Sequence, residues 1–230
     1  MPISRRTIAL LIPMSLLAAS AYAISLSDLS NQDASSGLKA ALTTGTNAAV
    51  SKLGAEGGFL DNAKVRIPLP KILEQARPIL KMTGKGQQLD DLVVQMNRAA
   101  ESAVPMAKPL LIDAVKSMSI NDAKNILTGG DTSVTDFFRS RTQDKLAVQF
   151  LPVVKKVTDR SGVATQYNAA MSLAPKMGVL AKDQATVEGY VTQRALDGLY
   201  TMIAEEEKAI RADPLGTGSK LIGKVFGALK

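Results

Sequence analysis

Apolar residues recur at three- and four-residue intervals along most of the chain, which places them on one face of successive helices. The clearest stripes run over 34–53, 89–104, 134–157 and 186–212. No segment shows the strict alternation of a strand, and no period typical of repeat proteins is present. The pattern therefore predicts an all-α fold, a single-domain irregular helical bundle of about seven to nine helices.

The helical spacing breaks between the first two helices. Residues 57–70 read GGFLDNAKVRIPLP, and a residue that precedes proline is driven out of the helical region. We expect an extended, proline-containing arm, with or without a short hairpin, that lays its apolar side chains across the helices.

Prolines and glycines predict how the helices end or bend. Pro78 should distort the helix that follows the arm, and Pro152 should bend the long helix that begins near Asp131. Pro105 should force a kink or a restart before the segment 110–118. We expect Gly162 to close the long helix.

Helix starts and stops are densest between Met96 and Asp136. Ser119 is a good N-cap with Asp122 three residues later, Gly129 and Gly130 can end a short helix, and Asp131 or Thr132 can cap the next one. The predicted capping turn comprises Ser119, Gly129, Gly130, Asp131 and Thr132. An anion-binding loop is the alternative, but Asp131 already supplies an anion at the helix start.

Polar residues lie on or beside the apolar stripes of two helices. They are Asn97, Arg98 and Glu101 on one helix and Arg194, Asp197 and Glu206 on the other. If the helices touch, a buried carboxylate–guanidinium network would fix their register, and the alternative is the polar wall of a binding pocket. A cation site formed by the consecutive glutamates near Glu205 and Glu207 is not expected, because consecutive helical residues point about 100° apart and cannot easily share one ion. We therefore expect Glu205 and Glu207 on a solvated face.

Residues 215–230 predict a glycine-rich hinge followed by an amphipathic helix. Its apolar face would comprise Leu221, Ile222, Val225, Phe226 and Leu229, opposed to lysines. This face either docks on the protein's own body or makes reversible contact with an anionic membrane surface.

The first 23 residues have the form of an export signal. Arg5 and Arg6 precede an apolar run over 8–19, and small residues end at Ala23. We expect cleavage after Ala23, with Ala21 as the second choice, through the ordinary export route rather than the twin-arginine one. Residues 24–214 would then form the helical domain of a periplasmic or secreted protein, soluble after cleavage.

Composition narrows the possible partners and chemistry. The formal charge of +7 falls by two when the signal is removed, and aromatic residues make up only 4%. In an exported protein, this mild positive charge and the scarcity of aromatic residues favour an anionic envelope surface over nucleic acid as the partner. The absence of cysteine excludes disulfides and thiolate metal sites.

No complete catalytic motif is present. The chain contains no histidine, which excludes histidine-based triads and metal sites. Ser36 and Lys39 match a Ser-x-x-Lys pattern, yet its companion elements are missing. We therefore predict no catalytic residue, no metal site and no cofactor.

Four blocks carry a family resemblance: GFLDNAKVRIPLP at 58–70, MNRAAESAVPMAKP at 96–109, DAKNILTGGDT at 122–132 and ALDGLYTMIAEEEKAIRADP at 195–214. Together they resemble the bacterial envelope family known as domain of unknown function 4197. Tyr200 stands where that family suggests Phe. The resemblance implies a secreted, mostly helical domain and supplies no activity, ligand or catalytic residue.

These observations favour a non-catalytic periplasmic module that binds an apolar or lipid-like ligand, between helices or beneath the arm at 65–70. The alternative is an envelope scaffold that contacts another envelope protein and takes no small ligand. An enzyme using carboxylates or a Ser/Lys pair is the third hypothesis. A continuous apolar void above about 300 Å³ would favour the ligand, and a filled core would favour the scaffold.

Overall fold

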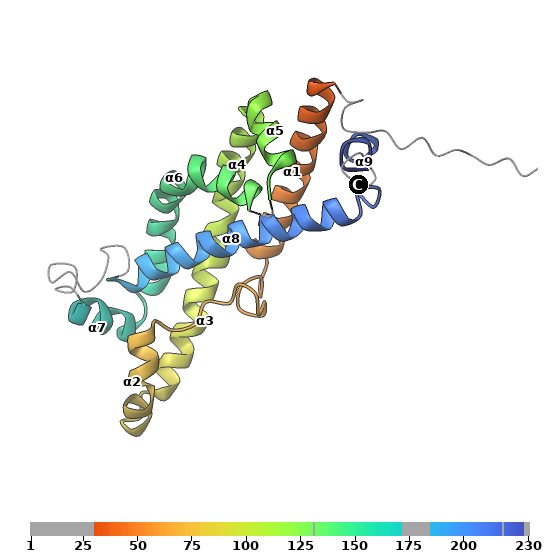
Figure 1. Ribbon diagram of the computed structural model, residues 1–230. Coiled ribbons are helices and arrows are strands. Elements are labelled where there is room, and N and C mark those ends of the chain that lie inside the picture. Colours follow the sequence, from red (N-terminus) through yellow and green to blue (C-terminus); the bar gives the residue numbers. More distant parts are fainter. Residues whose placement is uncertain (1–29, 131, 172–184, 218, 228–230) are drawn as a thin grey trace, which may run out of the picture.

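A computed structural model describes residues 30–130, 132–171, 185–217 and 219–227, and its regular elements in these ranges are all helical (Figure 1). The elements are α1 (Asn31–Gly54), α2 (Lys71–Met82), α3 (Gly86–Ala103), the 3₁₀ turn η2 (Val104–Met106), α4 (Ala107–Lys116), α5 (Ile120–Thr128), α6 (Ser133–Thr158), α7 (Gly162–Met171), α8 (Val187–Ala212) and α9 (Lys220–Gly227). The all-α prediction is confirmed. The export signal at 1–23 lies outside the described residues.

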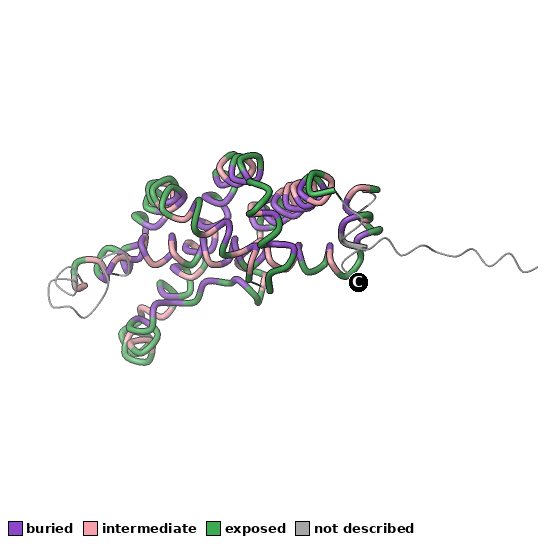
Figure 2. Tube along the Cα trace, turned by 45° about the horizontal axis from the view of Figure 1, so that its top comes forward, coloured by how far each residue is buried: buried purple, intermediate pink, exposed green. Residues whose placement is uncertain are grey.

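The core forms where α8 crosses α1, α3 and α6 (Figure 1). Buried residues follow the inner faces of these long helices (Figure 2). Within the apolar stripe predicted over 186–212, Val191, Ala195, Gly198 and Met202 of α8 are buried. None of the helices in the described ranges combines the length and the apolar character needed to cross a membrane.

The α6–α8 contact contains one buried polar pair. The hydroxyl groups of Tyr200 and Thr142 lie 2.9 Å apart, and the Tyr200 side chain is fully buried. Burial raises the pKa of Tyr200, so the hydroxyl keeps its proton for this hydrogen bond. The tyrosine is therefore accommodated because Thr142 supplies a polar partner.

Pro105 acts as the sequence predicts, because α3 ends before it and a new helix starts after it. Pro78 and Pro152 lie inside α2 and α6, which continue past them, and Pro105 lies in η2, between α3 and α4. The expectation for Gly162 was wrong. The long helix already ends at Thr158, and Gly162 begins α7 instead of closing α6.

The turn on either side of α5 is built by the predicted capping chemistry. The Ser119 side chain accepts a hydrogen bond from the Asp122 N–H, and the Asp122 carboxylate accepts one from the Ser119 N–H. Gly129 follows the last residue of α5, and Gly130 is exposed beside it. Thr132 precedes α6 without a capping side-chain hydrogen bond to the described residues, while Asp131 lies outside them. The geometry is that of a helix-to-helix turn.

The C-terminal helix α9 packs on α1. Ile222 and Val225 are buried, and the Lys224 ammonium lies 3.3 Å from the Asp33 carboxylate. A Cβ atom at Gly37 would lie 2.3 Å from Val225 Cγ2, so only glycine permits this close approach. Leu221 is partly buried, whereas Leu229 and the Phe226 side chain lie beyond what the structure describes. The tail thus uses its apolar face for docking.

Two glycines of α1 provide a matched test of this docking. Gly37→Ala should be destabilising, because overpacking costs about 1–3 kcal/mol and exceeds the gain in helix propensity. Gly45→Ala places its Cβ at ordinary contact distance, 3.4 Å from Glu206 Cβ, and should stabilise by up to about 1 kcal/mol. Thermal unfolding with limited trypsin digestion of the tail measures both effects. Equal gains from the two variants would contradict the docked position of α9.

Candidate functional site

The segment between α1 and α2 is an arm that crosses the bundle. Residues 55–65 form turns, and residues 66–70 are extended and lead directly into α2. The arm buries Phe59, Val65, Ile67 and Leu69. The predicted arm is confirmed, and it contains no hairpin strands within the described residues.

Asn97 of α3 holds the extended part of the arm. Its Oδ1 accepts a hydrogen bond from the Ile67 N–H at 2.8 Å, and its Nδ2 donates to the Ile67 carbonyl at 2.9 Å. The amide also donates to the Val93 carbonyl one turn earlier. Asn97 is fully buried, so a single side chain satisfies both backbone groups of Ile67 as a neighbouring strand would.

Glu101, one turn further along α3, holds the turn part of the arm. Its Oε1 accepts hydrogen bonds from the N–H groups of Phe59 and Leu60, at 3.0 and 3.1 Å. Its Oε2 accepts one from Arg98 at 2.7 Å, and Arg98 also pairs with Glu56. We call Asn97 and Glu101, with the backbone groups that they bind, the arm clamp.

The electrostatics of the clamp favour a charged Glu101. Burial raises the pKa of Glu101, but the hydrogen bonds from Arg98 and from the two backbone N–H groups outweigh it. The pKa of this carboxyl therefore lies below its usual value. The arm is held by an ionised, nearly buried carboxylate.

The other side of the arm lies against α8. A Cβ atom at Gly198 would lie 2.7 Å from the Phe59 ring, so the missing side chain makes room for Phe59. The Tyr190 hydroxyl donates to the Pro68 carbonyl at 3.2 Å, and Lys64 of the arm pairs with Glu205. The arm is therefore bound on both sides, by α3 and by α8.

The six residues predicted as one polar network do not form one. Asp197 pairs with Arg139 of α6 at 3.2 Å, and Glu206 pairs with Lys52 of α1 at 2.5 Å. Arg194 is exposed and lies over the Tyr190 ring. Among the ion pairs of the described residues, none joins Arg98 or Glu101 to α8. The expected register lock was wrong, because Asn97 and Glu101 of α3 bind the arm, whereas Asp197 and Glu206 of α8 pair with α6 and α1.

Glu207 was assigned to a solvated face, and this expectation was also wrong. The residue is 5% exposed and pairs with Arg211, which donates to the Ile126 carbonyl at the end of α5. A sequence signal for this burial exists. Glu207 comes four residues after Ile203 and three before Ile210, on the buried stripe of α8.

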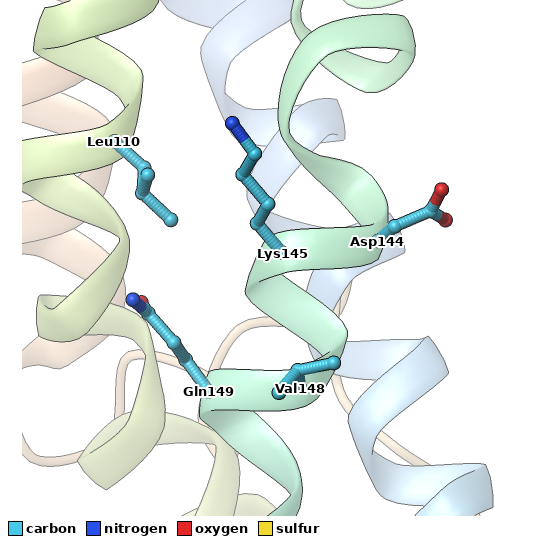
Figure 3. A pocket seen from close by; sticks show the side chains of 5 residues that line it. All are labelled: Leu110, Asp144, Lys145, Val148 and Gln149. Atoms are coloured by element: carbon cyan, nitrogen blue, oxygen red, sulfur yellow. The ribbon is translucent and has the colours of Figure 1, made fainter.

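Two open pockets lie on the surface, one beside the arm clamp and one between α4 and α6. A polar pocket of about 300 Å³ lies beside the clamp and is lined by Gly54, Glu56, Arg98, Glu101 and Ser102. A larger groove of about 410 Å³ lies between α4 and α6 and is lined by Leu110, Asp144, Lys145, Val148 and Gln149. In Figure 3, Leu110, Lys145 and Gln149 lie toward the gap between the helices, while Asp144 points away from it. We call this second pocket the α4–α6 groove.

The expected site beneath the arm is already filled by the arm itself. Ile67 and Leu69 are 1% and 4% exposed, so their side chains occupy the space between arm and helices. This arrangement resembles a packed core more than the roof of a ligand cavity.

The comparisons with known proteins identify a family. A family described as "Protein of unknown function (DUF4197)" matches residues 28–227, so the chain belongs to this family. No curated protein and no solved structure matches the chain. The family description assigns no activity.

Asn97→Ala tests the first half of the clamp. The substitution leaves the buried N–H and C=O of Ile67 without partners, so the free energy of unfolding should fall by roughly 2–3 kcal/mol. Asn125→Ala, on an exposed face of α5, is the matched control and should change it by less than about 0.5 kcal/mol. Urea unfolding measures both, and similar values would show that Asn97 is not needed to hold the arm.

Glu101→Gln tests the second half through its pH dependence. Because the folded-state pKa is lowered, the stabilisation by the carboxylate is complete above the unfolded pKa of about 4.3 and is lost as pH falls through the folded value. Wild type should therefore be more stable than Glu101→Gln at neutral pH, and the difference should shrink below about pH 4. Urea midpoints across this range measure the difference, with Glu56→Gln as the exposed control. A constant difference at all pH values would contradict an ionised clamp.

Proposed function

We propose that the protein is a non-catalytic helical module of the bacterial envelope that binds an apolar or lipid-like ligand in the α4–α6 groove. Its periplasmic location rests on the export signal expected at residues 1–23. The observation that supports ligand binding most directly is the exposed apolar lining of the groove.

The groove presents apolar side chains to solvent from both helices. Val148 of α6, which is 74% exposed, and Leu110 of α4, which is partly buried, both line the groove. Two further apolar residues are exposed nearby in the sequence: Met106 of η2, four residues before Leu110, is 40% exposed, and Leu151 of α6, three residues after Val148, is 42% exposed. Exposed apolar surface of this kind marks ligand or partner sites, and the volume of the groove lies within the range of ligand pockets.

Charge at the groove favours an amphipathic anion. Lys145 is exposed and lies toward the gap, whereas the carboxylate of Asp144 points away (Figure 3). An acyl chain could contact Leu110 and Val148 while its anionic head group meets the ammonium of Lys145. We expect the groove to bind this ligand without catalysing a reaction, because the residues that line it include no nucleophile paired with a general base.

An envelope scaffold without a small ligand is the second candidate. The filled space beneath the arm favours this candidate, because the buried side chains of the arm pack against the helices instead of covering a cavity. Ligand retention distinguishes the two functions.

Native mass spectrometry of the mature protein purified from its own periplasm tests the proposal. We expect a bound species that is released by solvent extraction. We also expect the intact mass of a polypeptide that starts at Ile24. Val148→Asp should lose the bound species, whereas Leu215→Asp, which changes an equally exposed residue after α8, should retain it. A wild-type protein that carries no bound species and takes up no added fatty acid would favour the scaffold.

A further inference from the structure

We propose that the hairpin formed by α2 and the start of α3 is a membrane-contact element that inserts its tip into a lipid surface of negative charge. This inference is independent of the α4–α6 groove and uses different residues. It concerns residues 71–89, at the end of the bundle opposite α9 (Figure 1).

α2 has a wide apolar face, and only part of that face is covered. Leu73 is the buried residue of this helix, while Ile72, Ile79 and Met82 are 42%, 67% and 89% exposed. Ile72 and Ile79 are two turns apart and share a face, and Met82 follows one turn later near the tip. Figure 2 shows the far end of α2 without buried positions. An amphipathic helix of 12 residues thus presents an apolar surface to solvent.

The charge around this surface is positive. From Pro78 to Leu89 the chain contains Lys81 and Lys85 and no carboxylate. Glu74, the acid of α2, and Asp90 of α3 both pair with Arg77, at 2.9 and 2.7 Å. Asp91 lies further from the tip, at the base of the hairpin, and accepts a hydrogen bond from Gln87.

The tip of the hairpin fits an anionic bilayer surface. Its exposed apolar side chains can contact the acyl chains, and the lysines beside them can contact the negatively charged head groups. Amphipathic helices of this kind bury their apolar face at the boundary of head groups and acyl chains, while their lysines meet the lipid phosphates. The turn at the tip of the hairpin is exposed to solvent. Gly84 adopts a φ of +76°, and a Cβ atom there would meet no other atom within 4 Å.

The base of the hairpin is held in place by an ion pair and by the arm clamp. Arg77 joins α2 to α3 through Asp90, and the arm that precedes α2 is fixed by the clamp. The membrane contact that the sequence allowed for the tail is thus better assigned to α2, because α9 uses its own apolar face on α1.

Vesicle flotation of the mature protein provides the test, with phosphatidylcholine vesicles compared with vesicles that also contain phosphatidylglycerol. Wild type should float with the anionic vesicles only, and less so as salt rises. The double variant Ile79→Asp and Met82→Asp, and the double variant Lys81→Glu and Lys85→Glu, should each lower the partition about tenfold or more. Leu215→Asp, which changes an exposed apolar residue outside the hairpin, is the control and should float as wild type does.

All substituted side chains in the hairpin are exposed or partly so, and the variants should keep the melting temperature of wild type. The proposal is wrong if wild type does not float, if it floats equally with both vesicles, or if the hairpin variants float normally. It is also wrong if Met82→Asp instead converts a dimer to a monomer, because the face would then bind a second copy.

Discussion

The backbone of the arm needs hydrogen-bond partners, and this need organises the centre of the molecule. An extended segment inside a helical bundle has no neighbouring strand, and buried N–H and C=O groups without partners are costly. Asn97 and Glu101, one turn apart on α3, supply these partners to Ile67, Phe59 and Leu60. Two side chains of one helix thus provide the hydrogen bonds that a neighbouring strand would otherwise provide.

Several other features follow from the fixed arm. Phe59 fills the space that Gly198 leaves on α8, so the arm joins α3 to α8. None of the ion pairs between described residues joins these two helices directly. The arm ends at Pro70 and continues into α2, so the clamp also sets where the hairpin projects. The proposed membrane contact and the central packing are therefore linked through 14 residues, counted from Gly57 to Pro70.

Local signals in the sequence predicted the helices, the Ser119 cap and the extended arm, because each depends on neighbours in the chain. The partners of polar residues were harder to predict. Asn97 and Glu101 were identified as polar residues at a buried stripe, but their partners are backbone groups of the arm, which side-chain patterns do not reveal. Arg194 sits at the edge of its stripe, and its long side chain reaches solvent.

Periodicity also leaves open whether an apolar face is covered. Ile72 and Ile79 belong to a regular helical stripe, yet the structure exposes both, and their exposure distinguishes α2 from the tail. In the tail, the spacing of Ile222 and Val225 fits docking and membrane contact equally well. Only the glycine at position 37 of α1, far away in the sequence, permits the docked arrangement.

Native-state hydrogen exchange of individual backbone amides tests the clamp most directly. Although they lie outside any helix, the amides of Phe59, Leu60 and Ile67 should exchange as slowly as those in the cores of α3 and α8, because their acceptors are buried side chains. Exchange of these three amides at the rate of an exposed loop would contradict the account.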